Sequence, residues 1–134
     1  LESELRLELP RSFTLAIFGD HVRGEFDDGG DVPRVPPGRL GAELAWQHGG
    51  WDLAGRVPEG LEQDRTGEGE RSVPGYTLLA ARAEYVFAAG GGEWTLFLRG
   101  ENLLDEEIRN ASSLLRDVAP EAGLNIEAGV RLAF

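Results

Sequence analysis

The chain has 134 residues and contains neither cysteine nor methionine, and its 24 acidic and 13 basic residues give a formal net charge of -11. This length suits a single domain over residues 1–134, and the excess negative charge would repel nucleic-acid phosphates, which excludes nucleic acid as a partner. The longest uncharged apolar stretches, such as residues 76–81, are far shorter than the roughly 18 residues that a membrane-spanning helix needs, which excludes a helical membrane protein.

Alternation of apolar and polar residues with a period of two predicts β-strands along most of the chain. In chain order the alternating segments are residues 4–9, 13–26, 40–47, 51–57, 79–87, 94–101 and 124–134. The pattern has three irregularities: Phe18 and Phe97 fall on the polar side of their segments, and Pro58 is expected to end the fourth strand. We therefore expect an all-β, antiparallel protein of about seven strands.

The predicted connections alternate strictly between short and long. Short turns are expected at residues 10–12, 48–50 and 88–92, and long polar loops at residues 27–37, 59–74 and 105–122. In an up-and-down meander this rhythm puts every short turn at one end of the sheet and every long loop at the other. Bacterial outer-membrane barrels have this polarity, with short turns in the periplasm and long loops outside.

Aromatic residues gather on the apolar side of the predicted strands, close to the short turns. They are Trp46, Trp51, Tyr85, Phe87 and Trp94, with Phe13 and Phe134 at the same level. Such a row is typical of the aromatic girdle where membrane hydrocarbon meets the head groups. A soluble barrel or sandwich with its apolar side turned inward would alternate in the same way. The clustering at one end, together with the loop asymmetry, favours the membrane interpretation.

From residue 75 onward the sequence resembles the end of TonB-dependent outer-membrane receptors. The resemblance lies in GYTLL at 75–79, NLLD at 102–105 and a last strand that closes on an aromatic residue. GDHVRG at 19–24, VPRVPPGRLG at 32–41, GEW at 92–94 and the loop at 111–115 are similar to the zinc-uptake branch of these receptors.

The resemblance implies a location in the bacterial outer membrane, with membrane lipid as a partner. It also implies that the barrel-assembly machinery reads the last strand, whose signal would be Phe134 with Leu132 and Val130 on the same face.

The family's barrel has about 22 strands and an N-terminal plug domain, whereas this sequence holds only about seven strands and no plug. The missing initiator methionine and the lack of a leader indicate a mature form or a fragment. An open sheet in hydrocarbon would leave unpaired N–H and C=O groups at its edges. We therefore expect the remaining strands of a larger barrel, further copies of this chain or an unrecognised eighth strand to close it.

A metal site has little support in the sequence. The weak candidates for its ligands are His21, Asp20, Asp27 and Asp28. The zinc-uptake resemblance makes His21 a peripheral candidate, but the acidic loop does not match an EF-hand and is better explained as solvated. His21 and His48 should lie at opposite ends of the sheet, so a joint site is not expected. No cofactor is predicted.

A mixed-charge set lies on the polar sides of the last three predicted strands. Its members are Arg82, Glu84, Arg99, Glu101, Glu127 and Arg131. We expect structural ion pairs between strands, because the sequence has no nucleophile elbow and no phosphate-binding glycine loop that would indicate an enzyme.

The sequence therefore predicts a segment of an antiparallel, up-and-down transmembrane β-barrel, belonging to a TonB-dependent receptor-like transporter for a metal ion or metal chelate. Two alternatives stay open. One is a small, self-associating outer-membrane barrel with a structural role, and the other is a soluble acidic β-barrel that binds an apolar ligand.

Overall fold

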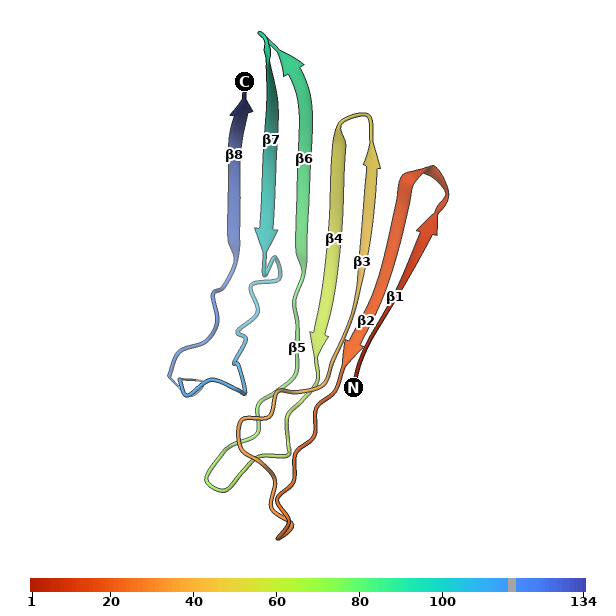
Figure 1. Cartoon of the computed structure of the whole chain (residues 1–134). Coiled ribbons are helices and arrows are strands. Elements are labelled where there is room, and N and C mark those ends of the chain that lie inside the picture. The colour runs from red at the N-terminus through yellow and green to blue at the C-terminus, as the bar shows by residue number, and fades with distance from the viewer. Residues whose placement is uncertain (116–117) are drawn as a thin grey trace.

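The computed structural model describes residues 1–115 and 118–134, which form one antiparallel sheet of eight strands (Figure 1). The strands are β1 (Glu2–Leu9), β2 (Phe13–Asp20), β3 (Arg39–His48), β4 (Trp51–Gly60), β5 (Tyr76–Thr77), β6 (Ala80–Ala89), β7 (Gly92–Glu101) and β8 (Asn125–Ala133). Their order in the sheet is β1-β2-β3-β4-β6-β7-β8, with the two-residue β5 pairing with the end of β4. The all-β, up-and-down architecture predicted from the sequence is confirmed.

The connections follow the predicted rhythm. The short ones are the 3-10 turn η1 (Pro10–Ser12) and the glycine pairs 49–50 and 90–91, whereas residues 21–38, 61–75 and 102–124 form the long ones. All four glycines have positive φ, between 58° and 87°, as tight hairpin turns of the I′ type require. Figure 1 shows the short turns and the C-terminus at one end of the sheet, here the turn end. The long loops and the N-terminus lie at the other, here the loop end.

Cross-strand register divides the sheet into an apolar face and a polar face. One row of directly paired residues crosses all seven long strands with apolar side chains only: Leu9, Phe13, Trp46, Leu53, Ala83, Leu98 and Ala128. The adjacent row, on the opposite face, consists of Glu8, Thr14, Ala45, Ala54, Arg82, Arg99 and Glu127. Two-faced strands follow from the period-two alternation of the sequence.

No second layer covers the apolar face in the described part of the chain. Leu44, Leu98 and Val130 keep 48%, 51% and 59% of their surface exposed. Only four apolar residues of the described chain are buried: Ala16, Val73, Ile108 and Ala111. The sheet therefore carries a large apolar surface that nothing in the described structure removes from solvent.

The sheet is not closed into a barrel. β1 pairs only with β2, and β8 pairs only with β7, so each leaves one edge without a strand partner among the described residues. The described chain contains no helix of the length and apolarity needed to cross a membrane.

The second strand is shorter than the sequence pattern suggested. We expected it to run to residue 26, but β2 ends at Asp20. Phe26 lies in a turn instead, where its N–H donates to the carbonyl oxygen of Gly30 at 2.7 Å and Gly29 adopts a φ of 90°. The turn-forming residues of the Asp-Asp-Gly-Gly segment therefore override the apolar alternation that precedes them.

The fourth strand is longer than expected, because β4 continues through Pro58 to Gly60. The carbonyl oxygen of Pro58 accepts a hydrogen bond from the N–H of Leu78 at 2.9 Å. The backbone nitrogen of Pro58, which has no hydrogen to donate, is on the same side of the strand and faces the interruption between β5 and β6. A missing donor is tolerated where the neighbouring strand is broken.

The two misplaced aromatic residues have a common explanation. Phe18 is paired with Gly41 and Phe97 with Gly129, and each ring lies so close to its glycine that a Cβ there would approach it to 2.5 Å. An arginine guanidinium lies over the outer face of each ring, Arg56 at 4.4 Å from the Phe18 centroid and Arg99 at 5.2 Å from that of Phe97. Rings that cover glycines on the neighbouring strand hold the register at positions with no side chain of their own.

We predict that Gly41→Ala lowers the free energy of unfolding by about 1–3 kcal/mol, because the added methyl would displace the Phe18 ring and approach the Pro58 backbone. Urea-induced unfolding followed by tryptophan fluorescence measures this change. Gly55→Ala is the matched control, because a Cβ there meets nothing within 4 Å and should leave stability unchanged or slightly raised. Equal midpoints for the two variants would contradict a packing role for the ring.

Candidate binding pocket at the loop end

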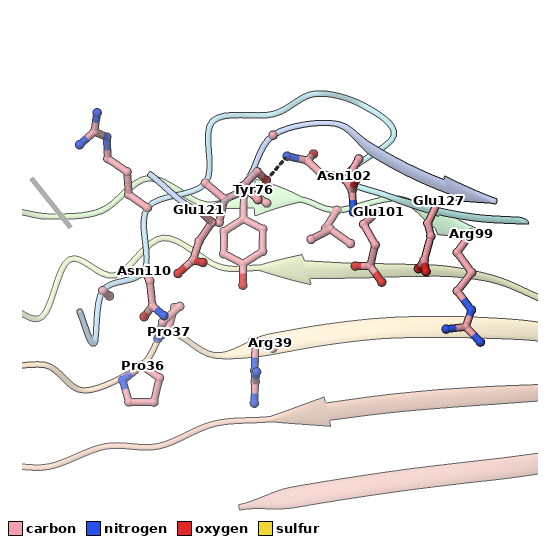
Figure 2. A pocket seen from close by; sticks show the side chains of 17 residues that line it. Pro36, Pro37, Arg39, Tyr76, Arg99, Glu101, Asn102, Asn110, Glu121 and Glu127 are labelled. Carbon is pink, nitrogen blue, oxygen red and sulfur yellow. Dashed lines mark hydrogen bonds between the residues drawn. The ribbon is translucent and has the colours of Figure 1, made fainter. Parts of the chain in front are cut away.

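A pocket of about 680 Å³ lies on the polar face at the loop end of the sheet. Its floor consists of polar-face residues near the ends of the strands, including Arg39, Glu101 and Glu127, and the long loops contribute Pro36 and Ile108. The lining comes mainly from the 21–38 and 102–124 loops and from β3, β5, β7 and β8, and Figure 2 shows these residues around the same space. Two of the long loops therefore fold over the polar face rather than the apolar one. This volume is typical of small-molecule sites.

Acidic side chains share one side of this pocket. In Figure 2, Glu101, Glu121, Glu127 and the hydroxyl group of Tyr76 point in a common direction, toward the strand that carries Arg39. They come from β7, the 102–124 loop, β8 and β5, so four separate segments bring them together.

The arginines of the pocket are already paired with carboxylates outside it. Arg39 lies 2.9 Å from Asp20, Arg99 lies 2.8 Å from Glu84, and Arg109 lies 2.7 Å from Glu107. By contrast, Glu101, Glu121 and Glu127 take part in no ion pair within the described part of the chain. Because the arginines already bind other carboxylates, the three glutamates are the charged groups of the lining that form no salt bridge in the described chain, which favours positively charged groups of a solute.

Asn102 anchors the loop that forms one wall of the pocket. It is 2% exposed, and its φ of 47° lies in the left-handed region that asparagine tolerates best after glycine. Its Nδ2 donates to the carbonyl oxygens of Glu106 at 2.8 Å and Ala122 at 3.2 Å, and its Oδ1 accepts from the N–H of Glu106 at 3.0 Å. One side chain thus joins the beginning of the loop to its end.

Asp105 and Glu106 complete this anchor. The Asp105 carboxylate accepts from the N–H of Leu124 at 3.0 Å, directly before β8. The Glu106 carboxylate accepts from the N–H of Thr77 at 2.9 Å and so fixes the loop to β5. The NLLD element, found in the sequence through a family resemblance, is here a structural anchor. Residues 102–106 hold the loop against the polar face.

The structure does not assemble the weak metal candidates. The Asp20 carboxylate is paired with Arg39, whereas Asp27 and Asp28 are exposed in a turn. His21 lines a separate pocket of about 320 Å³ between residues 21–38 and 61–65. The described chain contains no group of three or more His, Asp or Glu side chains that could hold a metal ion. His48 lies at the turn end, opposite His21, as predicted.

The mixed-charge set lies on one face, as expected. Arg99 and Glu84 form an ion pair between strands, of the kind predicted for this set. Arg82 pairs at 3.3 Å with Asp52 on β4, which lies outside the predicted set. Arg131 and Glu127 share the face through the pairing of β8 with β7.

The predicted aromatic residues form a nearly continuous row on the apolar face at the turn end. Phe13 and Trp46 have ring centroids 6.3 Å apart, and the chain Trp51, Tyr85, Phe87, Trp94 has successive separations of 4.6, 5.7 and 6.5 Å. Two indole N–H groups bind the turns, since Trp46 Nε1 donates to the Arg11 carbonyl at 3.1 Å and Trp94 Nε1 to the Ala89 carbonyl at 3.2 Å.

The last strand continues the apolar face to the turn end. Val130 is paired with Leu96, and Leu132 with Trp94. Phe134 follows β8 with its side chain fully exposed. Of the three residues proposed as an assembly signal, Val130 and Leu132 therefore lie in the edge strand β8, and Phe134 follows it directly.

No known protein-family model matches this chain.

We predict that Asn102→Ala loosens the 102–124 loop and costs about 1–3 kcal/mol of stability, because Glu106 N–H loses its acceptor and Ala122 its donor. Limited proteolysis with mass spectrometry should show faster cleavage within residues 103–124. Asn102→Gly keeps the positive φ accessible without the side chain and should be cleaved equally fast.

The control for this experiment is Asn110→Ala. Asn110 is exposed in the same loop, and among the described residues its side chain accepts only the local N–H of Ser112 at 3.0 Å. Cleavage as fast in Asn110→Ala as in Asn102→Ala would contradict the anchoring role.

Proposed function

We propose that this chain forms part of the wall of a β-barrel in the bacterial outer membrane, within a TonB-dependent receptor-like transporter for a metal ion or metal chelate. One observation carries the proposal. The apolar face is continuous across all seven long strands and uncovered in the described chain, whereas the opposite face carries ion pairs and a pocket lined by charged side chains. Contact with lipid would suit the apolar face, and contact with an aqueous lumen would suit the polar face.

The strand lengths fit a membrane. β3, β4, β6 and β7 each have 10 residues. At ~3.3 Å per residue they span ~33 Å, and the ~45° tilt of barrel strands reduces this to ~23 Å along the membrane normal. The apolar band of outer-membrane barrels is ~25 Å tall. The aromatic row at the turn end would then lie at one membrane surface.

The loops argue against the soluble alternative. A soluble barrel would turn its apolar face inward, and its loops would be expected to cover the open apolar interior. Here residues 36–37 and 108–111 fold over the polar face and line the pocket there. Loops that cover the polar face suit a barrel whose polar face is the lumen.

Strand direction favours a larger barrel over a ring of identical chains. Because seven strands alternate in direction, β1 and β8 both run from the loop end to the turn end. Copies in the same membrane orientation would therefore meet in a parallel seam, although every other pair in the sheet is antiparallel. A partner wall with an odd number of strands makes both junctions antiparallel and the total even, as in bacterial barrels.

The proposed cargo rests on two observations. The first is the resemblance of residues 19–24 and 32–41 to the zinc-uptake branch of the receptors. The second is the pocket at the loop end, where Glu101, Glu121 and Glu127 lie in the lining without a salt bridge in the described chain. A cationic solute entering from the loop side would meet this wall first.

Membrane insertion is tested with vesicles that carry brominated acyl chains, which quench only tryptophans in contact with lipid. We predict strong quenching of Trp51, whose side chain is exposed on the apolar face, measured in a variant with Trp46 and Trp94 changed to Phe. A chain that stays monomeric in water without detergent, with unquenched tryptophan, would contradict the membrane proposal.

The same preparation separates the two membrane alternatives. Native mass spectrometry in detergent should find this chain bound to a longer partner polypeptide rather than in a closed ring of copies. A closed ring of copies would contradict the assignment to a receptor-like transporter, but it would still agree with a membrane barrel.

We predict that deleting Phe134 reduces outer-membrane assembly several-fold, because the assembly signal would lose its terminal aromatic residue on the exposed edge strand. Heat-modifiable mobility in gels of membrane fractions measures the assembled amount. Phe134→Tyr keeps an aromatic end and should assemble normally. Full assembly of the deletion variant would remove this role from Phe134.

A further inference from the structure

Ionisable side chains are nearly absent from the apolar face, and the few that occur are unevenly distributed. In the seven long strands this face carries one carboxylate, Glu59, at the loop end, and one basic residue, His48, at the turn end. The chain as a whole has a net charge of -11. A turn end free of carboxylates on this face is therefore a local departure from the composition of the molecule.

Three hydrogen-bonding side chains form a row across this turn end. His48 is directly paired with Trp51 across β3 and β4, and Trp51 is directly paired with Tyr85 across β4 and β6. The Trp51 and Tyr85 rings are in contact, with centroids 4.6 Å apart. Neighbouring strands lie about 4.8 Å apart, so Trp51 lies between His48 and Tyr85, about one strand spacing from each.

The polar tips of this row are unused in the described structure. Trp51 is 45% exposed and His48 is exposed, and neither the indole N–H, the imidazole nor the Tyr85 hydroxyl has a hydrogen-bond partner among the described residues. Trp46 and Trp94 differ, because their indole N–H groups bind turn carbonyls. Trp51 is thus the tryptophan of the girdle whose donor remains accessible.

Arg11 adds a fixed positive charge beside this row. It lies in η1, exposed and outside every ion pair of the described chain, and its carbonyl oxygen accepts the hydrogen bond of Trp46. The ring of Trp46 in turn lies 6.0 Å from that of His48. Donors of three kinds therefore lie at one level of the sheet, and an unpaired arginine of the described chain lies in the turn between β1 and β2 at the same end.

We infer that His48, Trp51 and Tyr85, with Arg11 beside them, bind the phosphate of a phospholipid head group at the turn-end surface of the membrane. The inference rests on the proposed membrane location. A phosphate is an anion with several acceptor oxygens, so it matches a carboxylate-free set of N–H and O–H donors that already faces the lipid. The head group would fix the level of the sheet in the bilayer.

The test compares lipids with and without phosphate. The assembled protein is placed in vesicles of digalactosyldiacylglycerol, which lacks phosphate, with a trace of spin-labelled phosphatidylglycerol or spin-labelled diacylglycerol. Electron spin resonance then measures how strongly each probe associates with the protein surface. We expect a several-fold preference for the phosphatidylglycerol probe.

Trp51→Phe keeps the ring and removes only the N–H, so it should lower this preference by about threefold to tenfold, as should His48→Ala. The matched controls are Trp94→Phe, whose N–H donates to the Ala89 carbonyl, and His21→Ala at the loop end; both should keep the wild-type preference. An equal loss in Trp51→Phe and Trp94→Phe would overturn the assignment.

Adding inorganic phosphate distinguishes a site for a lipid head group from a site for free phosphate. We expect millimolar phosphate to leave the probe bound, and displacement would mean a site for free phosphate rather than lipid. A protein that inserts but prefers neither probe defeats this inference alone. A protein that inserts into no vesicle defeats the proposed function.

Discussion

The cross-strand register is the constraint on which the other features of this protein depend. Because side chains alternate along a strand, a slip of one residue would move every apolar side chain of that strand to the polar face. Several interactions hold the register: the Phe18 ring over Gly41, the Phe97 ring over Gly129 and ion pairs such as Asp20 with Arg39. The uncovered apolar face, the polar pocket and the aromatic row all follow from that one alignment.

Sequence reasoning predicted most of the fold because its signals are local. Alternation and glycine turns are properties of a few adjacent residues, so the seven long strands and the polarity of the loops were predicted before their partners were known. The errors came where a neighbouring strand decides the outcome. Pro58 continues its strand because β5 and β6 are interrupted beside it, and Phe18 belongs on the polar face because Gly41 lies opposite.

The pocket was not predictable in the same way, because its geometry depends on contacts between distant residues. Asn102 reaches Ala122, and Asp105 reaches Leu124, across a loop whose sequence has no periodic signal. The signal that was present was chemical: Asn and Asp tolerate positive φ and cap loops. Their occurrence in NLLD at a strand end suggests an anchor, but only the fold identifies which residues it holds.

Two parts of the described sheet lack partners: its apolar face and its two edge strands. The partners that they need differ in kind. Its apolar face needs contact with apolar groups, which acyl chains supply without any specific geometry. The edges of β1 and β8 need hydrogen-bonding partners, which acyl chains lack. Lipid alone therefore cannot complete this structure. In the proposed barrel, the strands that complete it must continue the lumen with their polar sides and the apolar band with their apolar sides, because a mismatch of faces at either edge would bury charge in hydrocarbon.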